Sequence, residues 1–119
     1  MHARLSEIVL DCPDMTVMAD FYSALTGWPV VHTDVDWISL KGDGDVKLAF
    51  QLAPDHVAPQ WPNPGHPQQL HLDFIVDDAD EGQALALGLG ARLLDASPEH
   101  KTFRVYADPA GHPFCLCTS

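Results

Sequence analysis

The feature that most constrains this chain is an internal repeat, because the second half restates the pattern of the first at an offset of 64 residues, which aligns Glu7 with His71. Each half opens on an alternating apolar stretch, EIVLDCPD at 7–14 and HLDFIVDD at 71–78, and a helical stretch follows at 15–25 and at 79–89. Further strands are expected at 37–40, 47–52, 103–106 and 114–117. A repeated supersecondary unit decides the fold, so the sequence predicts an α+β chain of two tandem βαβββ modules.

The first strand of each module alternates with a period of two, which gives the strand two different faces. One face is expected to lie beneath the helix and is formed by Ile8, Leu10, Cys12, Leu72, Phe74 and Val76. The opposite face is formed by Glu7, Val9, Asp11, His71, Asp73 and Ile75. Carboxylates beside an imidazole are costly to bury unless they are paired, hydrated or bound to a ligand. This polar face therefore predicts a wet concavity in which function lies.

Capping residues mark the expected helix ends. Asp14 and Asp78 stand where a side chain can accept hydrogen bonds from first-turn amides, and Gly27 and Gly90 stand where the chain leaves the helices. The buried face of the first helix is predicted by the spacing of Val17, Phe21, Ala24 and Leu25. Leu116, near the end of the chain, is expected to be buried beneath the second helix.

A chain of 119 residues is expected to form a single domain at 1–119, with module one at 4–52, a linker at 53–69 and module two at 70–119. The linker holds five prolines, which stiffen the chain and oppose regular structure. Trp61 stands in its middle, and an indole is costly to leave in water. Two alternatives stay open, because Trp61 either anchors the linker on the body or covers a pocket.

The charge of the chain excludes some partners. Seventeen acidic residues against six basic ones give a net charge of −11, which repels nucleic acids and anionic membrane surfaces. Apolar runs fall short of the roughly 20 residues that span a bilayer, and the N-terminus does not resemble a secretory signal. A cytoplasmic protein is expected. Cys12, Cys115 and Cys117 are an odd number without the spacing of a redox or zinc motif, so they are expected to be reduced, with Cys115 and Cys117 as a buried structural pair on one strand face.

Several segments together carry a family resemblance. The strand starts EIVLDCPD and HLDFIVDD, the segment FYSALTGW at the end of the first helix, and ADPAGHPFCL near the C-terminus are similar to the glyoxalase/bleomycin resistance/dioxygenase superfamily, also called the vicinal oxygen chelate superfamily. The resemblance covers nearly the whole chain. It implies that the two modules form a β-cup around a small organic molecule, either within one chain or exchanged between two chains. Because cups of this type are commonly completed by pairing, a homodimer is expected.

The resemblance also implies where a divalent metal would be held. In metal-dependent members, the first and last strand of each module each supply one ligand, and those positions here are Glu7, Ala49, His71 and Cys115. Alanine cannot ligate, so Glu7 and His71 form only half of a shell for an ion that needs four to six donors. Gln51, on the strand of Ala49, and Asp73, on the face of His71, could supply further oxygens.

The residues leave three hypotheses open. The preferred one is a binding or sequestration protein without a cofactor, whose pocket is formed by Glu7, Asp11, Trp37, Gln51, Trp61, His71, Asp73 and Cys115. The alternative is a metal-dependent lyase, isomerase or extradiol-type dioxygenase. The third is a metal-free enzyme with His71 as general base. The remaining histidines, at positions 2, 32, 56, 66, 100 and 112, are expected to be exposed rather than catalytic. If the repeat were accidental, a ferredoxin-like α+β module would replace the cup.

Overall fold

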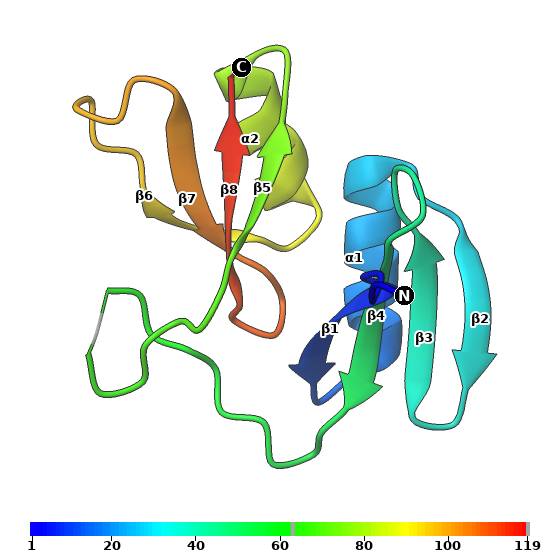
Figure 1. Ribbon diagram of the computed structural model, residues 1–119. Helices are drawn as coiled ribbons and strands as arrows, with labels where there is room; N and C mark the ends of the chain where they lie inside the picture. The colour runs from blue at the N-terminus through cyan, green and yellow to red at the C-terminus, as the bar shows by residue number, and fades with distance from the viewer. Residues whose placement is uncertain (63, 119) are drawn as a thin grey trace. The chain divides into compact units, whose positions relative to one another are not determined.

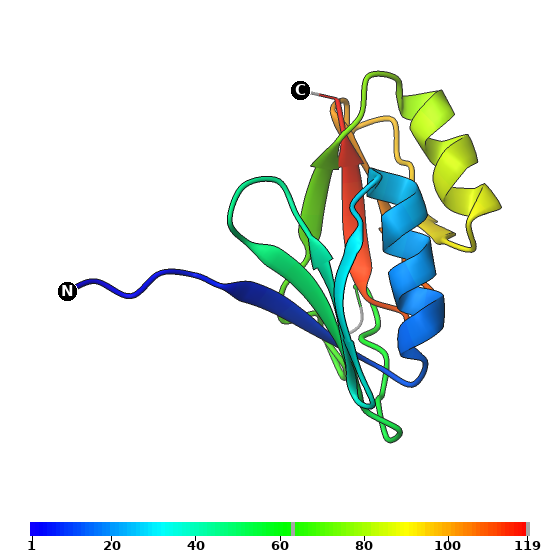
Figure 2. The same cartoon turned by 90° about the vertical axis from the view of Figure 1, so that its right-hand side faces the viewer.

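The computed structural model describes residues 1–62 and 64–118, and it divides into two compact units, Met1–His56 and Val57–Ser119. Each unit contains one βαβββ module (Figures 1 and 2). The elements of the first are β1 (Glu7–Cys12), α1 (Met15–Thr26), β2 (Val30–Asp34), β3 (Trp37–Lys41) and β4 (Lys47–Leu52). The elements of the second are β5 (Leu72–Ile75), α2 (Ala79–Gly88), β6 (Arg92–Asp95), β7 (Phe103–Ala107) and β8 (Pro113–Cys117).

The two modules have the same topology, which confirms the repeat. Their strand orders are β1-β4-β3-β2 and β5-β8-β7-β6. In each sheet the first strand runs parallel to the last strand of the module, and the other neighbours are antiparallel. A parallel neighbour requires a crossover connection, which α1 and α2 provide. No helix in the described ranges 1–62 and 64–118 is long and apolar enough to cross a membrane.

In module one the helix covers the apolar face of the sheet, as strand alternation predicts. Helix α1 contacts β3 and β4, and the ring of Tyr22 stacks on that of Phe50 with centroids 5.7 Å apart. The buried core of this unit comprises Leu10, Cys12, Met18, Ala19, Phe21, Tyr22, Ile38, Leu40, Leu48 and Phe50. The buried residues of β1, Leu10 and Cys12, therefore lie on the helix side of the sheet.

The caps of α1 are as predicted, but its buried face is rotated from the expected one. Asp14 accepts a hydrogen bond from the amide of Val17, and Gly27 ends the helix in the left-handed region at φ 81°. Val17 and Ala24 are exposed, whereas Met18 and Tyr22 are buried. The helix is apolar around most of its circumference, so spacing alone did not select the stripe that meets the sheet.

Module two holds its helix by a different means. The buried residues of α2 are Gly82 and Ala86, and a Cβ added at Gly82 would lie 3.1 Å from Val76 and 3.4 Å from Leu116. Such small residues bring the helix close to the sheet but bury little apolar surface. Asp78 caps the helix at the amide of Glu81, as predicted.

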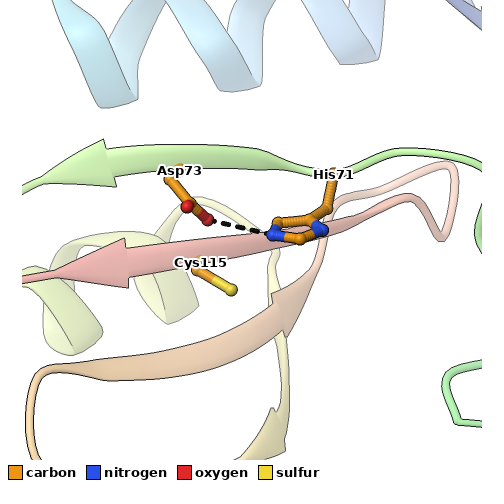
Figure 3. Close-up of side chains that lie close together, drawn as sticks. All are labelled: His71, Asp73 and Cys115. Atoms are coloured by element: carbon orange, nitrogen blue, oxygen red, sulfur yellow. Dashed lines mark ion pairs between the residues drawn. The ribbon is translucent and has the colours of Figure 1, made fainter.

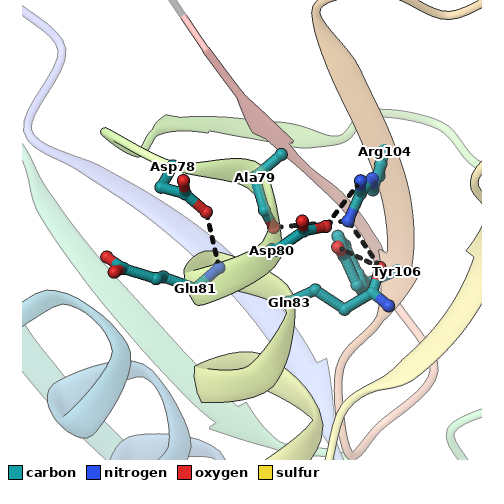
Figure 4. Close-up of polar contacts among 7 residues, drawn as sticks. All are labelled: Asp78, Ala79, Asp80, Glu81, Gln83, Arg104 and Tyr106. Carbon is teal, nitrogen blue, oxygen red and sulfur yellow. Dashed lines mark hydrogen bonds and ion pairs between the residues drawn. The ribbon is translucent and has the colours of Figure 1, made fainter.

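Polar contacts also join α2 to the sheet (Figure 4). Arg104 on β7 donates to Asp80 at 3.0 Å and to the side-chain oxygen of Gln83 at 3.1 Å. The hydroxyl of Tyr106 donates to the same oxygen of Gln83 at 3.1 Å. Asp80 and Gln83 of α2 are thus hydrogen-bonded to β7. These contacts lie on the sheet face that carries Leu72, Phe114 and Leu116.

The first strands are less buried than the sequence predicts. Ile8, Leu72 and Phe74 are only half-buried, although Leu10, Phe21 and Leu116 are buried as expected. The reason is that β1 and β5 are edge strands of their own sheets. Each therefore has a neighbouring strand of the same sheet on one side only.

Sequence patterning did not locate β2 or β6. Every residue of β2 is exposed, and β6 has no buried residue, so neither strand shows a period-two apolar pattern. Both strands also contain a register shift, between Val30 and His32 in β2 and between Leu93 and Asp95 in β6. An extra residue at such a bulge reverses the face to which the following side chains point.

Candidate functional site

Three potential ligand residues meet on the sheet face of module two that points away from α2 (Figure 3). His71 immediately precedes β5, Asp73 lies within it, and Cys115 on β8 is the register partner of Asp73. His71 Nε2 lies 3.2 Å from Asp73 Oδ1. One potential ligand atom from each of the three residues lies within 4.8 Å of the others. The alternation of β5 thus separates this polar cluster from Leu72 and Phe74, as predicted.

The cluster is polar at its rim and apolar at its base. The side chains of His71 and Asp73 are 43% and 58% exposed, whereas Cys115 is 6% exposed. Burial, together with the charge and hydrogen bonding of Asp73, raises the pKa of the Cys115 thiol to about 12. At neutral pH Cys115 is therefore an uncharged thiol, which behaves as a small apolar group with a weak S–H donor.

The predicted residues of module one also share a sheet face. Asp11, Gln51 and Trp37 are register partners across β1, β4 and β3. The indole of Trp37 donates to the Ser39 hydroxyl at 2.9 Å, and this hydroxyl donates to Glu7 Oε1 at 3.2 Å. Trp37 is thereby held against the sheet by a polar chain that the sequence did not reveal, because Ser39 was not among the candidate residues.

The metal positions implied for module one are poorly suited to an ion. Ala49 is fully buried and has no donor atom in its side chain. Glu7 accepts the hydrogen bond from Ser39 and lies 4.0 Å from the ammonium of Lys47. Its carboxylate therefore already has a hydroxyl and a cation as partners. Glu7 belongs to the first unit and His71 to the second.

Trp61 lies in a hollow formed within the linker. This hollow has a volume of about 200 Å³ and is lined by Gln60, Trp61, Pro62, Pro64, Pro67 and Gln68. Trp61 is half-buried there among prolines. The indole is partly withdrawn from water by the linker itself, and its expected place in the ligand pocket stays a prediction.

Sequence reasoning missed a second histidine–aspartate pair in module two. His100 Nε2 lies 3.1 Å from Asp95 Oδ2, and the His100 ring stacks on Phe103 with centroids 4.6 Å apart. Asp95 Oδ1 accepts hydrogen bonds from the amide and the hydroxyl of Ser97, which lower the pKa of Asp95, and His100 lowers it further. His100 is partly buried rather than exposed as expected. The spacing D-x-S-x-x-H within a turn is the signal that could have indicated it.

A family model described as a glyoxalase-like domain matches residues 7–117. The chain belongs to the glyoxalase-like domain family. The match runs from Glu7 at the start of β1 to Cys117 at the end of β8, so it includes both modules and the linker of this glyoxalase-like chain.

Curated relatives and solved structures agree with this assignment. The chain is 29% identical over 120 residues to proteins named "Putative glyoxylase CFP32" from Mycobacterium bovis and Mycobacterium tuberculosis, and it spans 93% of its own length but 41% of theirs. A glyoxalase/bleomycin resistance protein/dioxygenase family enzyme from Burkholderia phytofirmans has a TM-score of 0.77 at 21% identity, with 98% of each chain covered. The fosfomycin resistance protein FosX from Mesorhizobium loti has a TM-score of 0.74 at 18% identity, covering 100% of this chain and 94% of that one. These likenesses establish the fold.

Proposed function

We propose that this glyoxalase-like chain binds a small organic molecule on the face of the β5-β8-β7-β6 sheet that points away from α2, without a complete metal shell. The observation that carries the proposal is the exposed His71–Asp73 pair beside the buried, uncharged thiol of Cys115. A few convergent polar groups next to apolar surface are what a small-molecule site requires. We call the sheet face that carries His71, Asp73 and Cys115 the polar face of module two.

The chemistry of the donors favours binding over metal catalysis. In module one, Ala49 offers no ligand atom and Glu7 already contacts Ser39 and Lys47. The charge of the chain, −11, and the carboxylate of Asp73 favour cationic or hydroxyl-bearing ligands over phosphorylated ones.

We expect His71→Ala to weaken ligand binding while leaving the fold intact. A matched probe series consists of benzamidine, phenol and phenylphosphonate, and the expected order of affinity is benzamidine, then phenol, then phenylphosphonate. Loss of a hydrogen bond to a charged group costs about 1.5–3 kcal/mol, so benzamidine affinity should fall at least tenfold in His71→Ala. The free energy of unfolding should change by no more than about 0.5 kcal/mol. Calorimetric titration and urea denaturation measure the two effects.

The control is His32→Ala. His32 lies on the fully exposed strand β2, 4.0 Å from Asp34, so it is a second exposed histidine–aspartate pair outside the proposed site. Benzamidine affinity should be unchanged in this variant. Equal losses in both variants, or tight binding of phenylphosphonate, would contradict the proposal.

A second candidate function is favoured by one observation. The imidazole, carboxylate and thiol of His71, Asp73 and Cys115 are close enough for a single divalent ion, and this mixed nitrogen, oxygen and sulfur set suits zinc or cobalt. These three side chains would hold the ion, and the bound ion would act as a Lewis acid on an oxygen of the substrate. The Lewis-acid reaction would then be that of a lyase or isomerase, whereas a dioxygenase would need a redox-active ion such as Fe²⁺ instead.

Titration with Co²⁺ separates the two functions. Under the binding proposal, Co²⁺ should give no stoichiometric thiolate-to-cobalt absorption in the near ultraviolet. A band that saturates at one ion per chain and disappears in Cys115→Ser would instead establish the metal-dependent alternative. Cys12→Ser is the matched control, because Cys12 is fully buried on the helix side of β1 and should leave such a band unchanged.

A further inference from the structure

The register of the module-two sheet brings four residues of separate strands into one row. Asp73 pairs with Cys115, Cys115 with Val105, and Val105 with Asp95, so these side chains lie across β5, β8, β7 and β6 on the same face. Neighbouring strands lie about 4.8 Å apart, so the backbones of Asp73 and Asp95 at the two ends of the row are roughly 14 Å apart. The polar face of module two thus has a carboxylate at each end.

The bulge in β6 is what places Asp95 on this face. Leu93 pairs with Tyr106 on the helix side, and regular alternation would turn Asp95 to the same side as Leu93. The register shift between these two residues makes Asp95 the partner of Val105 instead. Bulges of this kind redirect side chains and are frequent beside functional sites.

Each end of the row carries an imidazole on its carboxylate. His71 Nε2 lies 3.2 Å from Asp73, and His100 Nε2 lies 3.1 Å from Asp95. The second pair is more sheltered, with side chains 29% and 17% exposed for His100 and Asp95. In both pairs the same ring nitrogen meets the carboxylate, so the two ends of the row offer the same chemistry.

The middle of the row is apolar. Val105 and Cys115 are both buried, at 4% and 6% exposed. In the next row of the same face, Phe103 pairs with Cys117, and the Phe103 ring supports His100 by stacking. An apolar strip with a histidine–aspartate pair at each end matches a molecule with an apolar centre and two polar ends.

We infer that the polar face of module two takes an elongated, aromatic-centred ligand that carries a cationic or hydrogen-bond-donating group at each end, one held by His71–Asp73 and the other by His100–Asp95. This inference rests on the proposed function, because it adds a second polar end to the same binding face. It assigns His100 and Asp95 to recognition of the far end of the ligand.

The test compares a two-ended probe with a one-ended probe. The probes are 4,4′-diamidinobiphenyl, which has an amidine at each end of a rigid biphenyl, and 4-amidinobiphenyl, which has one. Affinities are measured by calorimetry on the full chain. The two-ended probe is expected to bind at least tenfold more tightly than the one-ended probe. Asp73→Asn and Asp95→Asn should each reduce this advantage to less than about twofold, and His100→Gln should reduce it in the same direction.

Ser97→Ala is the matched control for the loop. This substitution removes the hydroxyl that bonds Asp95 but leaves the Ser97 amide bond to Asp95 and the His100–Asp95 contact available. It should preserve the advantage of the two-ended probe. If Ser97→Ala removes the advantage as fully as Asp95→Asn does, the pair serves only to hold the loop, and the inference is wrong.

The remaining outcomes separate this inference from the proposed function. If Asp73→Asn weakens both probes while Asp95→Asn and His100→Gln weaken neither, the second end is refuted and the proposed binding at His71 and Asp73 stands. If none of the three substitutions affects either probe, both proposals are wrong. Thermal melts of each variant confirm the folded state, and His100→Gln decides the outcome if Asp95→Asn fails to fold.

Discussion

Phe114→Ala is expected to lower the free energy of unfolding by about 3–5 kcal/mol, the range for removing a buried aromatic side chain. Phe114 is fully buried on β8, an inner strand of the module-two sheet. Its ring lies 5.5 Å from that of Tyr106 and 6.1 Å from that of Phe74, centroid to centroid. Because Gly82 and Ala86 of α2 are small, few other side chains can fill the space that the ring would leave.

Urea denaturation measures this loss, with Ile75→Ala as control. Ile75 is another large apolar residue of the same module, but it is 76% exposed on the opposite sheet face. Its replacement should change the free energy of unfolding by no more than about 0.5 kcal/mol. A larger loss in Ile75→Ala than in Phe114→Ala would show that the two faces of the sheet are assigned the wrong way round.

Alkylation of Cys115 by iodoacetamide at pH 8 is expected to be on the order of a thousandfold slower in the folded protein than in the unfolded chain. The thiolate is the reactive form, and burial with the neighbouring Asp73 raises the pKa of this thiol from 9.0 to about 12. At a fixed pH of 8, a pKa that is higher by about three lowers the thiolate fraction by about a factor of a thousand. Mass spectrometry of the modified peptide distinguishes Cys115 from Cys117.

Two comparisons test the cause of this protection. Asp73→Asn removes a charge that raises the pKa of Cys115, so it should accelerate the alkylation of Cys115. Asp77→Asn, which removes an exposed charge after the end of β5, should not. Equal rates for Cys115 in folded protein and in guanidinium would show that the thiol is not buried as described.

The same pKa shift sets a direction for stability at high pH. The folded state retains the Cys115 proton above pH 9, where the unfolded chain releases it. The unfolded state then binds fewer protons than the folded state, so this thiol makes the free energy of unfolding fall as pH rises from about 9 towards 12. Below pH 9 its contribution is fully present.

The sequence was sufficient for the parts of the fold that follow strand alternation and capping. The faces of β1 and β5 were predicted from Leu10 and Asp73, and both helices begin after the predicted aspartates. The clustering of His71, Asp73 and Cys115 needed only that alternation together with the register of β5 on β8. The internal repeat predicted the two βαβββ modules, because the same pattern occurs twice at an offset of 64 residues.

The features that could not be predicted depend on interactions that leave no periodic signal. The position of Asp95 depends on a bulge, which reverses alternation at one point of a strand without buried residues. Because strand patterning did not find β6, His100 was assigned to an exposed loop, and its contacts with Asp95 and Phe103 were missed. The chain from Trp37 through Ser39 to Glu7 joins strands that are distant in sequence, and a serine carries no propensity that marks it.

The bulge occurs in both modules, at the strand that follows the helix in each case. In β2 it turns His32 towards the face of Ser39, and in β6 it turns Asp95 towards the face of Val105. The residues at the two bulges differ, although the backbone irregularity is the same. A backbone irregularity that recurs while its side chains differ is what duplication of one βαβββ unit, followed by divergence, would leave. The same position after the bulge thus presents an imidazole at His32 in module one and a carboxylate at Asp95 in module two.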